Sequence, residues 1–492
     1  MRSVEWFCAV LILMAAVPAQ ATEDSLRFGA FGEVRLYYES PHPANVVLFV
    51  SGDGGWNLGV VDMARTLASL DAVVAGIDIT HYFRALESSS QPCLYPAGDL
   101  ENLSKVVQQR MRAPEYEAPL LVGYSSGATL VYAVLAQSPS NAFKGAISLG
   151  FCPDLEIKRP LCRGDGLDWE PGPRGKGYNL LPTSSLEVPW VALQGTIDRV
   201  CSPEDTRKFV SRVSHGEIVM LPKVGHGFSV QKNWMSQFKA AFARITAYAD
   251  TTGSRAASTG PPSDSTNTAA PRSPGVASGS REPRDLPIVE VPVATGASST
   301  LAIILSGDGG WGKTEQGIAR DLAANGIGVV GWNSLRYYWK KRTPDEAARD
   351  LARIARHYLG AWRATRIALV GYSFGADVLP FLASRLPADL RGAVGPVALI
   401  GLSHHGEFEF HLGDWLGRGP STTEYPTLPE LQKLRGMRIY CFYGRHDSDI
   451  LCSEIDSTLA KCVTIAGGHR LRGNYAPISS VIIEEARRPG YK

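Results

Sequence analysis

Two motifs of the form Gly-x-Ser-x-Gly place a serine where it could act as a nucleophile. Residues 371–375 read Gly-Tyr-Ser-Phe-Gly, and residues 123–127 read Gly-Tyr-Ser-Ser-Gly. Each motif follows an apolar run typical of a buried strand and precedes a helical pattern, and in that setting the glycines permit a sharp turn that exposes the serine hydroxyl. A serine hydroxyl is a weak nucleophile until a base takes its proton. The pattern therefore predicts a serine–histidine–acid site at Ser373, with Ser125 as a second candidate.

The acid and the base should follow the serine in the chain, each on a loop after a later strand. After the strand-like run 439–443, an Asp-x-x-Cys-Ser pattern shared with the first half selects Asp449 as the acid, whereas alignment on the preceding glycine selects Asp447. We favour Asp449 because the cysteine match is the more specific of the two. His469 comes directly after two glycines and follows the last strand-like run, so it is the predicted base.

The first half carries the same parts for a second site. Asp198 lies in the matching Asp-x-x-Cys-Ser pattern, and His226 stands between two glycines after the next strand-like run. In the second half, His404 and His405 are the nearest competitors of the predicted base, but they follow a strand that comes one place too early. We therefore predict a second candidate triad of Ser125, Asp198 and His226.

A carbonyl attacked by serine needs hydrogen-bond donors for the negative charge that develops on its oxygen. One predicted donor is the backbone amide of the residue after the nucleophile, which is Phe374 in the second half and Ser126 in the first. The other is expected from a glycine-rich loop, Ser-Gly-Asp-Gly-Gly-Trp, which occurs at 306–311 and at 51–56. We assign it to Asp308 in the second half. The loop is not followed by Gly-Lys-Ser/Thr, which argues against a phosphate-binding loop.

The elements that must position these residues follow one pattern in both halves. Continuous apolar runs such as 302–305 and 367–370 alternate with helical stretches such as 344–359, where Thr343 with Glu346 three residues later marks a helix start. This alternation implies a mostly parallel sheet covered by helices on both faces. Because the glycine-rich loop, the serine motif and the acid turn recur in the same order, the chain is an internal duplication of one doubly wound α/β domain.

The chain divides into four segments. Residues 1–21 have Arg2 before an apolar run at 6–17 and end in Ala-Gln-Ala, which is typical of a cleaved secretory signal peptide. The first α/β domain is expected at 22–250 and the second at 286–492. Between them, residues 251–285 are rich in Ser, Thr, Gly, Pro and Ala, with no aromatic residue, and this composition predicts a flexible linker.

Composition excludes several classes of protein. The 50 Lys and Arg nearly balance the 48 Asp and Glu, so nucleic acid is not expected as a partner. The 44% of hydrophobic residues is typical of a globular chain.

Most of the seven cysteines after residue 21 should form disulfides in the periplasm, and their odd number leaves at least one unpaired. No cysteine and histidine spacing matches a zinc site, so we expect no metal and no cofactor.

The residues quoted above resemble the AcvB/VirJ family of bacterial virulence-associated proteins. The resemblance rests on the paired Ser-Gly-Asp-Gly-Gly-Trp loops, on Gly-Tyr-Ser-Phe-Gly-Ala-Asp at 371–377, and on the acid turn followed by cysteine. It implies two tandem α/β-hydrolase-like domains in the periplasm. It also implies hydrolysis of aminoacylated phosphatidylglycerol, chiefly the lysyl form, with Ser373 as the nucleophile. The chain departs from this expectation in one respect, because the serine motif of the first half is intact as well.

The implied reaction fits the predicted residues. An aminoacyl lipid is a carboxylic ester, so Ser373 would attack its carbonyl with His469 as the base, and water would then release the amino acid. Four acidic residues could pair with the ammonium groups of the substrate, although a surface role is the alternative for each: Asp308, Asp377, Glu407 and Glu409.

Access to a lipid substrate requires contact with the membrane surface. The segment 335–342 interleaves aromatic residues with cations and could lie at an anionic lipid interface; internal packing of the aromatic residues is the alternative. Two other functions are compatible with the sequence. One is an esterase or thioesterase with another acyl substrate, and the other is a non-enzymatic periplasmic adaptor for a secretion or DNA-transfer system.

Overall fold

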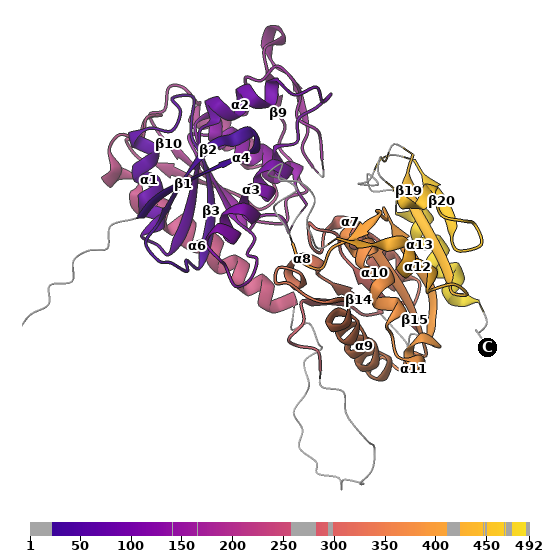
Figure 1. Cartoon of the computed structure of the whole chain (residues 1–492). Helices are drawn as coiled ribbons and strands as arrows, with labels where there is room; N and C mark the ends of the chain where they lie inside the picture. The colour runs from indigo at the N-terminus through magenta and orange to yellow at the C-terminus, as the bar shows by residue number, and fades with distance from the viewer. Residues whose placement is uncertain are drawn as a thin grey trace, which may run out of the picture.

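The computed structural model describes residues 22–139, 141–164, 166–256, 282–293, 299–410, 424–445, 447, 450–466, 468 and 475–488. The predicted signal peptide, most of the predicted linker and two predicted site residues, Asp449 and His469, lie outside these ranges. The two halves of the chain form two α/β units (Figure 1), as the duplication predicts.

The first half is built on an eight-stranded sheet with the order β1-β2-β4-β3-β5-β6-β10-β11. Neighbouring strands are parallel from β4 to β11, while β2 is antiparallel to both of its neighbours. The strands are β1 (Thr22–Phe28), β2 (Gly32–Tyr38), β3 (Asn45–Val50), β4 (Ala72–Ile77), β5 (Leu120–Tyr124), β6 (Gly145–Leu149), β10 (Trp190–Gly195) and β11 (Gly216–Leu221).

Helices cover this sheet, and a small separate sheet of order β7-β9-β8 lies between β6 and β10 in the chain. The helices are α1 (Leu58–Ala68), α2 (Ile79–Glu87), α3 (Pro96–Arg110), α4 (Ser126–Gln137), α5 (Pro203–Val210) and α6 (Met235–Ala256). The short strands are β7 (Asp154–Leu155), β8 (Trp169–Pro171) and β9 (Tyr178–Leu180). Helix α6 ends within the segment predicted as the linker.

The second half repeats this architecture, and the residues described there include no counterpart of β1. Its sheet has the order β12-β14-β13-β15-β16-β19-β20, with only β12 antiparallel. The strands are β12 (Ile288–Val291), β13 (Thr300–Leu305), β14 (Gly328–Trp332), β15 (Arg366–Tyr372), β16 (Val394–Ile400), β19 (Arg438–Gly444) and β20 (Lys461–Ile465), and a separate pair is β17 (His405–Gly406) with β18 (Tyr425–Pro426). The helices are α7 (Lys313–Ala324), α8 (Ser334–Tyr337), α9 (Pro344–Ala361), α10 (Phe374–Ser384), α11 (Ala388–Arg391), α12 (Thr427–Gln432) and α13 (Ala476–Arg487).

The central strands are apolar throughout because both faces of each sheet are buried. In β3, Val46, Leu48 and Val50 pack into the core on one face, while Val47 and Phe49 pack into the core on the other. The strand β13 repeats this alternation between two cores of its own. Burial on both faces is what the continuous apolar runs in the sequence predict, and the mostly parallel sheet is confirmed.

The predicted start of α9 is also confirmed. The Thr343 hydroxyl accepts the Glu346 amide at 3.2 Å, and the Glu346 carboxylate accepts the Thr343 amide at 2.8 Å. These two bonds satisfy backbone donors that a helix N-terminus leaves without partners.

The expectation that segment 335–342 contacts a membrane through its aromatic residues is wrong. Tyr337 and Tyr338 are buried in the core of the second half, and Trp339 is 8% exposed and packs against Tyr116 of the first half. The aromatic rings gain more from burial inside the protein than they would at an exposed loop. Only the basic residues of this segment reach the surface, among them Lys340.

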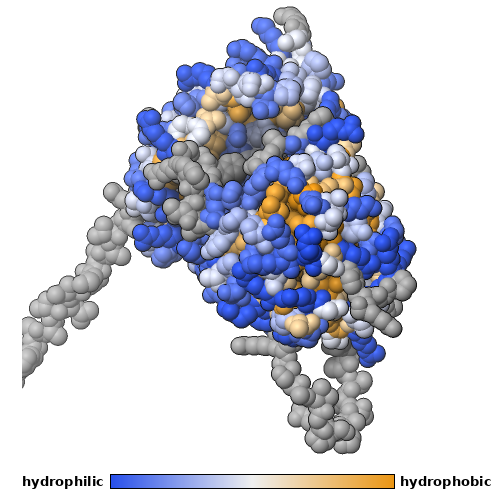
Figure 2. Space-filling model, turned by 45° about the vertical axis from the view of Figure 1, so that its right-hand side comes forward, coloured by the Kyte–Doolittle hydropathy of each residue, from blue (hydrophilic) through white to orange (hydrophobic). Residues whose placement is uncertain are grey.

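Three disulfides confirm that most cysteines pair, and they indicate an extracytoplasmic protein. They join Cys93 to Cys162, Cys152 to Cys201 and Cys441 to Cys452, while Cys462 is free. Hydrophilic side chains cover most of the face shown in Figure 2, with hydrophobic ones gathered near its centre. Within the described ranges, no helix combines the length and the apolar character that a membrane span requires.

Candidate active site

A strained turn holds Ser125 between β5 and α4. Its backbone φ is 55° and its ψ is −124°, a conformation that residues other than glycine rarely adopt. A Cβ at Gly123 would lie 2.1 Å from the Gly127 carbonyl oxygen, and a Cβ at Gly127 would lie 2.3 Å from that of Ser51. Both glycines of the motif are therefore required for the helix to start this close to the sheet. The serine is presented at the carboxyl edge of the parallel strands.

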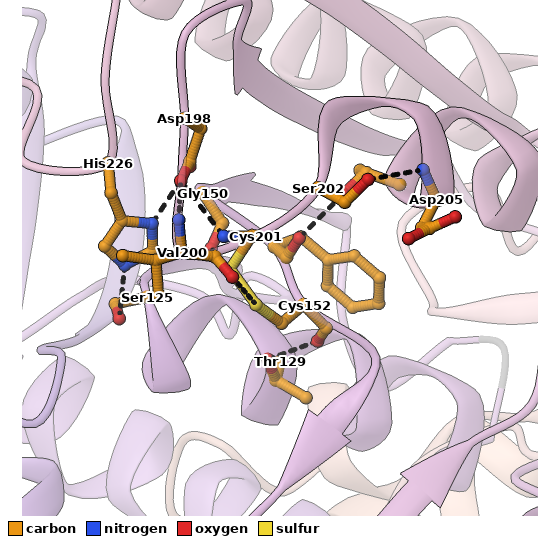
Figure 3. Close-up of a disulfide and its surroundings, with 12 residues drawn as sticks. Ser125, Thr129, Gly150, Cys152, Asp198, Val200, Cys201, Ser202, Asp205 and His226 are labelled. Atoms are coloured by element: carbon orange, nitrogen blue, oxygen red, sulfur yellow. Dashed lines mark hydrogen bonds and ion pairs between the residues drawn. A yellow bond between two sulfur atoms is a disulfide. The ribbon is translucent and has the colours of Figure 1, made fainter.

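Ser125, His226 and Asp198 form a continuous hydrogen-bonded chain (Figure 3). Ser125 Oγ lies 2.9 Å from His226 Nε2, and His226 Nδ1 lies 2.9 Å from Asp198 Oδ2. The acid follows β10 and the histidine follows β11, so neighbouring parallel strands deliver both to the same sheet edge. With its proton on Nδ1, the imidazole can accept the serine proton at Nε2, as a serine nucleophile requires.

The Asp198 carboxylate is fully buried and saturated with donors. Its Oδ1 accepts the backbone amides of Val200 at 2.8 Å and Cys201 at 3.0 Å. Its Oδ2 accepts Gln194 Nε2 at 3.1 Å, in addition to the histidine. These bonds offset the cost of burying a charge, and they fix which oxygen faces the imidazole.

Two further contacts support the loops that carry this chain. The disulfide between Cys152 and Cys201 ties the acid loop to the loop after β6 (Figure 3). The Tyr124 hydroxyl donates to the His226 carbonyl oxygen at 3.0 Å. Burial and the neighbouring Asp198 charge raise the pKa of Tyr124, so this hydroxyl keeps its proton and remains a donor.

The glycine-rich loop of the first half lies against the nucleophile. A Cβ at Gly52 would come within 2.9 Å of the Ser125 Cβ, so only glycine allows this approach. Ser126 Oγ donates to Asp53 Oδ1 at 2.6 Å, which joins this loop to the first residue of α4. The backbone amides of Asp53 and Ser126 belong to the two segments from which oxyanion donors are expected.

The second half places Ser373 in the same kind of turn. Its φ of 51° and ψ of −122° match the Ser125 values, and Phe374 begins α10 directly after it. A Cβ at Gly307 would lie 3.4 Å from the Ser373 Cβ, so the loop that carries Asp308 approaches this serine as well. The turn and the loop are thus repeated in both halves.

The structure describes Asp447 but not its alternative Asp449 or the predicted base His469. Asp447 lies three residues after Gly444, the last residue of β19, and its amide donates to the Gly444 carbonyl oxygen at 3.1 Å. Asp198 has the same relation to Gly195 at the end of β10, with an amide-to-carbonyl distance of 3.3 Å. By backbone position, Asp447 is therefore the counterpart of Asp198.

A buried glutamate holds the glycine-rich loop of the second half. Glu315, which is 2% exposed, accepts the amides of Gly307 and Gly312, each at 3.0 Å. Burial raises the pKa of Glu315 to about 7 from its ordinary value, against the opposing effect of the two amide bonds. This role could not be predicted from the local sequence, because an isolated Glu on a helix resembles any solvent-exposed Glu. The loop geometry beside Ser373 therefore depends on a titratable group.

The other predicted residues have mostly structural partners. Asp377 accepts the Ser403 amide at 2.7 Å and so holds the loop after β16. His404 lies 3.3 Å from Glu454, and His405 lies 3.8 Å from Glu424. Glu407 and Glu409 follow β17 and are half-buried.

Among the residues that the structure describes, one group of side chains has the spacing of metal ligands, namely Asp198, Cys201 and His226. Cys201 is bonded to Cys152, so its sulfur is not a thiolate ligand, and the His226 nitrogens face Ser125 and Asp198. The donor set suits a hydrogen-bonded triad better than a metal site.

A mostly parallel sheet, a strained serine turn at its centre, and an acid and a histidine after its last two strands define the α/β-hydrolase class of fold. The chain belongs to a family within this description, the bacterial virulence protein (VirJ) family, whose model matches residues 44–149 and 299–489. The match falls in both halves, in agreement with the resemblance seen in the motifs.

Solved structures similar to this chain include an esterase domain from Rhodothermus marinus, with 15% identity and a TM-score of 0.32 over 45% of this chain and 97% of that one. Another is the α/β serine hydrolase XC6422 from Xanthomonas campestris, with 18% identity and a TM-score of 0.30 over 47% of this chain and 96% of that one. These scores are too low for either likeness to support an argument about this chain. No curated protein matches it.

Proposed function

We propose that the protein is a periplasmic serine hydrolase of carboxylic esters. The observation that carries the proposal is the chain from Ser125 through His226 to Asp198, with both hydrogen bonds at 2.9 Å. In the reaction, Ser125 attacks the ester carbonyl while His226 Nε2 takes the hydroxyl proton. The imidazolium is stabilised by the buried carboxylate and then protonates the leaving alcohol; water next attacks the acyl-enzyme with the same base.

The same mechanism is proposed for the second half. Ser373 is the nucleophile and His469 the base, and we infer that Asp447 is the acid because its turn matches that of Asp198. The amides of Phe374 and Asp308 are the proposed oxyanion donors. The family resemblance points to this half as the main catalytic one.

The proposed substrate is aminoacylated phosphatidylglycerol, chiefly the lysyl form, which is cleaved to phosphatidylglycerol and a free amino acid. This substrate is the one implied by the resemblance to the AcvB/VirJ family, and the chain belongs to the VirJ family. Acidic side chains that could attract a cationic aminoacyl group lie on the loop and helix beside Ser373, namely Asp308 and Asp377. Their charge would favour the lysyl form over neutral ones.

A lipid substrate requires contact with the membrane, and the rim of the first site supports such contact. Three aliphatic side chains on the loops that carry the acid and the base are unusually exposed: Ile197 at 59%, Val200 at 68% and Val230 at 46%. Exposed cations stand among them, at Arg199, Lys223 and Lys232. Aliphatic groups that alternate with cations suit the surface of an anionic bilayer.

The test compares Ser125→Ala, Ser373→Ala and the double variant for release of lysine from lysyl-phosphatidylglycerol vesicles and for cleavage of p-nitrophenyl butyrate. We expect the double variant to lose both activities. Loss of lysine release with Ser125→Ala alone would assign the lipid reaction to the first half. Cleavage of the soluble ester without turnover of the lipid would indicate another esterase. Unchanged release in the double variant would contradict a serine mechanism, whereas absence of both activities from the wild-type protein would favour a non-enzymatic adaptor.

A further inference from the structure

A lysine of the first half reaches the catalytic loop of the second. Lys105 belongs to α3, which lies on the side of the first half that faces the second (Figure 1). Its side chain is 2% exposed. The ammonium contacts Glu101 Oε1 at 3.0 Å, donates to the backbone carbonyl oxygen of Asp308 at 3.2 Å, and lies 5.0 Å from the centre of the Phe410 ring. A buried ammonium is costly unless it is paired, and two of its three partners belong to the other half.

An apolar contact between the halves surrounds this lysine. Tyr116 of the first half forms a buried cluster with Leu335, Trp339 and Phe410 of the second. Two hydrogen bonds cross the same contact. Trp339 Nε1 donates to the Ala113 carbonyl oxygen at 2.9 Å, and Gln109 Nε2 donates to that of Phe410 at 2.9 Å. Lys105 is therefore part of a packed interface and not an isolated side chain.

The position of the Lys105 contact on the loop gives it a consequence for catalysis. The Asp308 amide, a proposed oxyanion donor, lies between two anchored points. On one side the Gly307 amide is bound by Glu315, and on the other the Asp308 carbonyl is bound by Lys105. The loop also lies directly against α3, because a Cβ at Gly309 would be 3.6 Å from Glu101 Oε1. Anchors on both sides fix the direction in which the amide points.

The first half anchors its own loop differently. There the bond from Ser126 Oγ to Asp53 Oδ1 joins the loop to α4 within one domain. Phe374 stands at the position of Ser126 in the second half and has no hydroxyl for this bond. The Lys105 ammonium supplies an anchor at the corresponding loop residue from outside the domain.

We propose that Lys105 is a positioning residue for the active site of the second half, so that docking of the first half completes the oxyanion hole beside Ser373. The proposal rests on the proposed serine hydrolase function of the second half. In this proposal the first half activates the site of the second half, in addition to carrying its own triad. The contact that matters is the ammonium bound to the Asp308 carbonyl, with Glu101 holding the ammonium in place.

The test uses the full chain with Ser125→Ala, so that only the second site turns over p-nitrophenyl butyrate. Lys105→Met keeps the length and packing of the side chain but removes the donor. We expect kcat to fall about tenfold with KM changed less than twofold, because a misplaced oxyanion donor weakens the transition state and not substrate binding. Hydrogen exchange of the amides in 306–312 should accelerate about tenfold. A boronate inhibitor, which forms a tetrahedral adduct with the serine, should lose about as much affinity as kcat loses rate.

The matched control is Lys144→Met, since Lys144 is also largely buried and pairs with Glu117 of its own half at 3.4 Å. It should leave kcat and the exchange of 306–312 unchanged. Equal kcat and equal exchange in the Lys105 and Lys144 variants would overturn the proposal. If the Ser125→Ala parent shows no turnover, the proposed function of the second half fails, and the exchange measurement alone still decides whether Lys105 holds the loop.

Discussion

The hydrogen bonds of Asp198 select the tautomer in which His226 can act as a base. Oδ1 faces two backbone amides, so in Asp198→Asn the amide oxygen would occupy that position and the NH₂ group would face the imidazole. Nδ1 would then have to accept a hydrogen bond from this NH₂ group, and Nε2 would carry the ring proton. Because a protonated Nε2 cannot take the hydroxyl proton, Ser125 would lose its base. In the Ser373→Ala background we expect kcat for p-nitrophenyl butyrate to fall by about 10³-fold or more.

The control for this prediction is Asp205→Asn, an exposed acid in the first turn of α5, which should leave kcat within about twofold. Far-UV circular dichroism and thermal unfolding check that both variants fold. A loss of less than about tenfold in Asp198→Asn would contradict the assigned role of the acid.

The two candidate acids of the second half can be separated in the same way. In the Ser125→Ala background, Asp447→Asn should lower kcat by about 10²-fold or more, whereas Asp449→Asn should change it less than about threefold. The reason is the turn of Asp447 after Gly444, which matches that of Asp198 after Gly195. If Asp449→Asn lowers kcat more than Asp447→Asn does, the acid is Asp449, as the alignment on the cysteine predicts.

At the scale of elements, α7 adds a pH-sensitive support to the catalytic loop through Glu315. Burial raises its pKa to about 7 from the ordinary 4.5. Between these values the folded state holds a proton that the unfolded state has released, so the free energy of unfolding falls as pH rises through this window, by about 3 kcal/mol in total. Glu315→Gln removes this titration. We expect the stability of the variant relative to wild type to increase by about that amount from pH 4.5 to 8, measured by urea denaturation.

Glu346→Gln is the control of opposite sign. Hydrogen bonds from Thr343 lower the pKa of Glu346, so its contribution to stability is present at neutral pH and is lost as pH falls through the lowered pKa. Relative to wild type, this variant should therefore become less stable as pH rises. The prediction would be contradicted if the difference in the free energy of unfolding between Glu315→Gln and wild type did not change with pH.

The sequence allowed the elements and the serine turns to be predicted, but not the supports around the sites. Gly123 and Gly127 are visible as a motif because no other residue fits their backbone contacts. Gln194, Glu315 and Lys105 act through tertiary contacts with residues far away in the chain, and nothing in their local sequence separates them from ordinary polar residues. The same limit explains the error at Trp339, whose partner Tyr116 lies in the other half.

The two candidate acids of the second half show what a local alignment leaves open. Cys201 pairs with Cys152 on the loop after β6, whereas Cys452 pairs with Cys441 inside β19. The two matching Asp-x-x-Cys-Ser patterns therefore serve different disulfides. An alignment anchored on the cysteine assumes an equivalence that the fold does not keep, while the glycine that ends each strand keeps its position.

At the scale of the whole molecule, the proposed lipid substrate would give each half a distinct part. The second half presents Ser373 beside a loop supported by Lys105 of the first. The first half carries exposed aliphatic residues around its own triad. If both sites act on lipid, the exposed rim of the first half is the surface that we expect to meet the bilayer.

This arrangement predicts how the protein partitions onto vesicles. Ile197→Ser with Val230→Ser removes two exposed aliphatic side chains without touching the triad, and we expect the affinity for phosphatidylglycerol vesicles to fall about tenfold in a co-sedimentation assay. Because Arg199, Lys223 and Lys232 add electrostatic attraction, wild-type binding should weaken as salt rises and should be poor on phosphatidylcholine vesicles. Leu428→Ser, which changes an exposed aliphatic residue of the second half, is the matched control. Unchanged partitioning of the double variant, with soluble-ester cleavage intact in all variants, would show that the membrane is met through another surface.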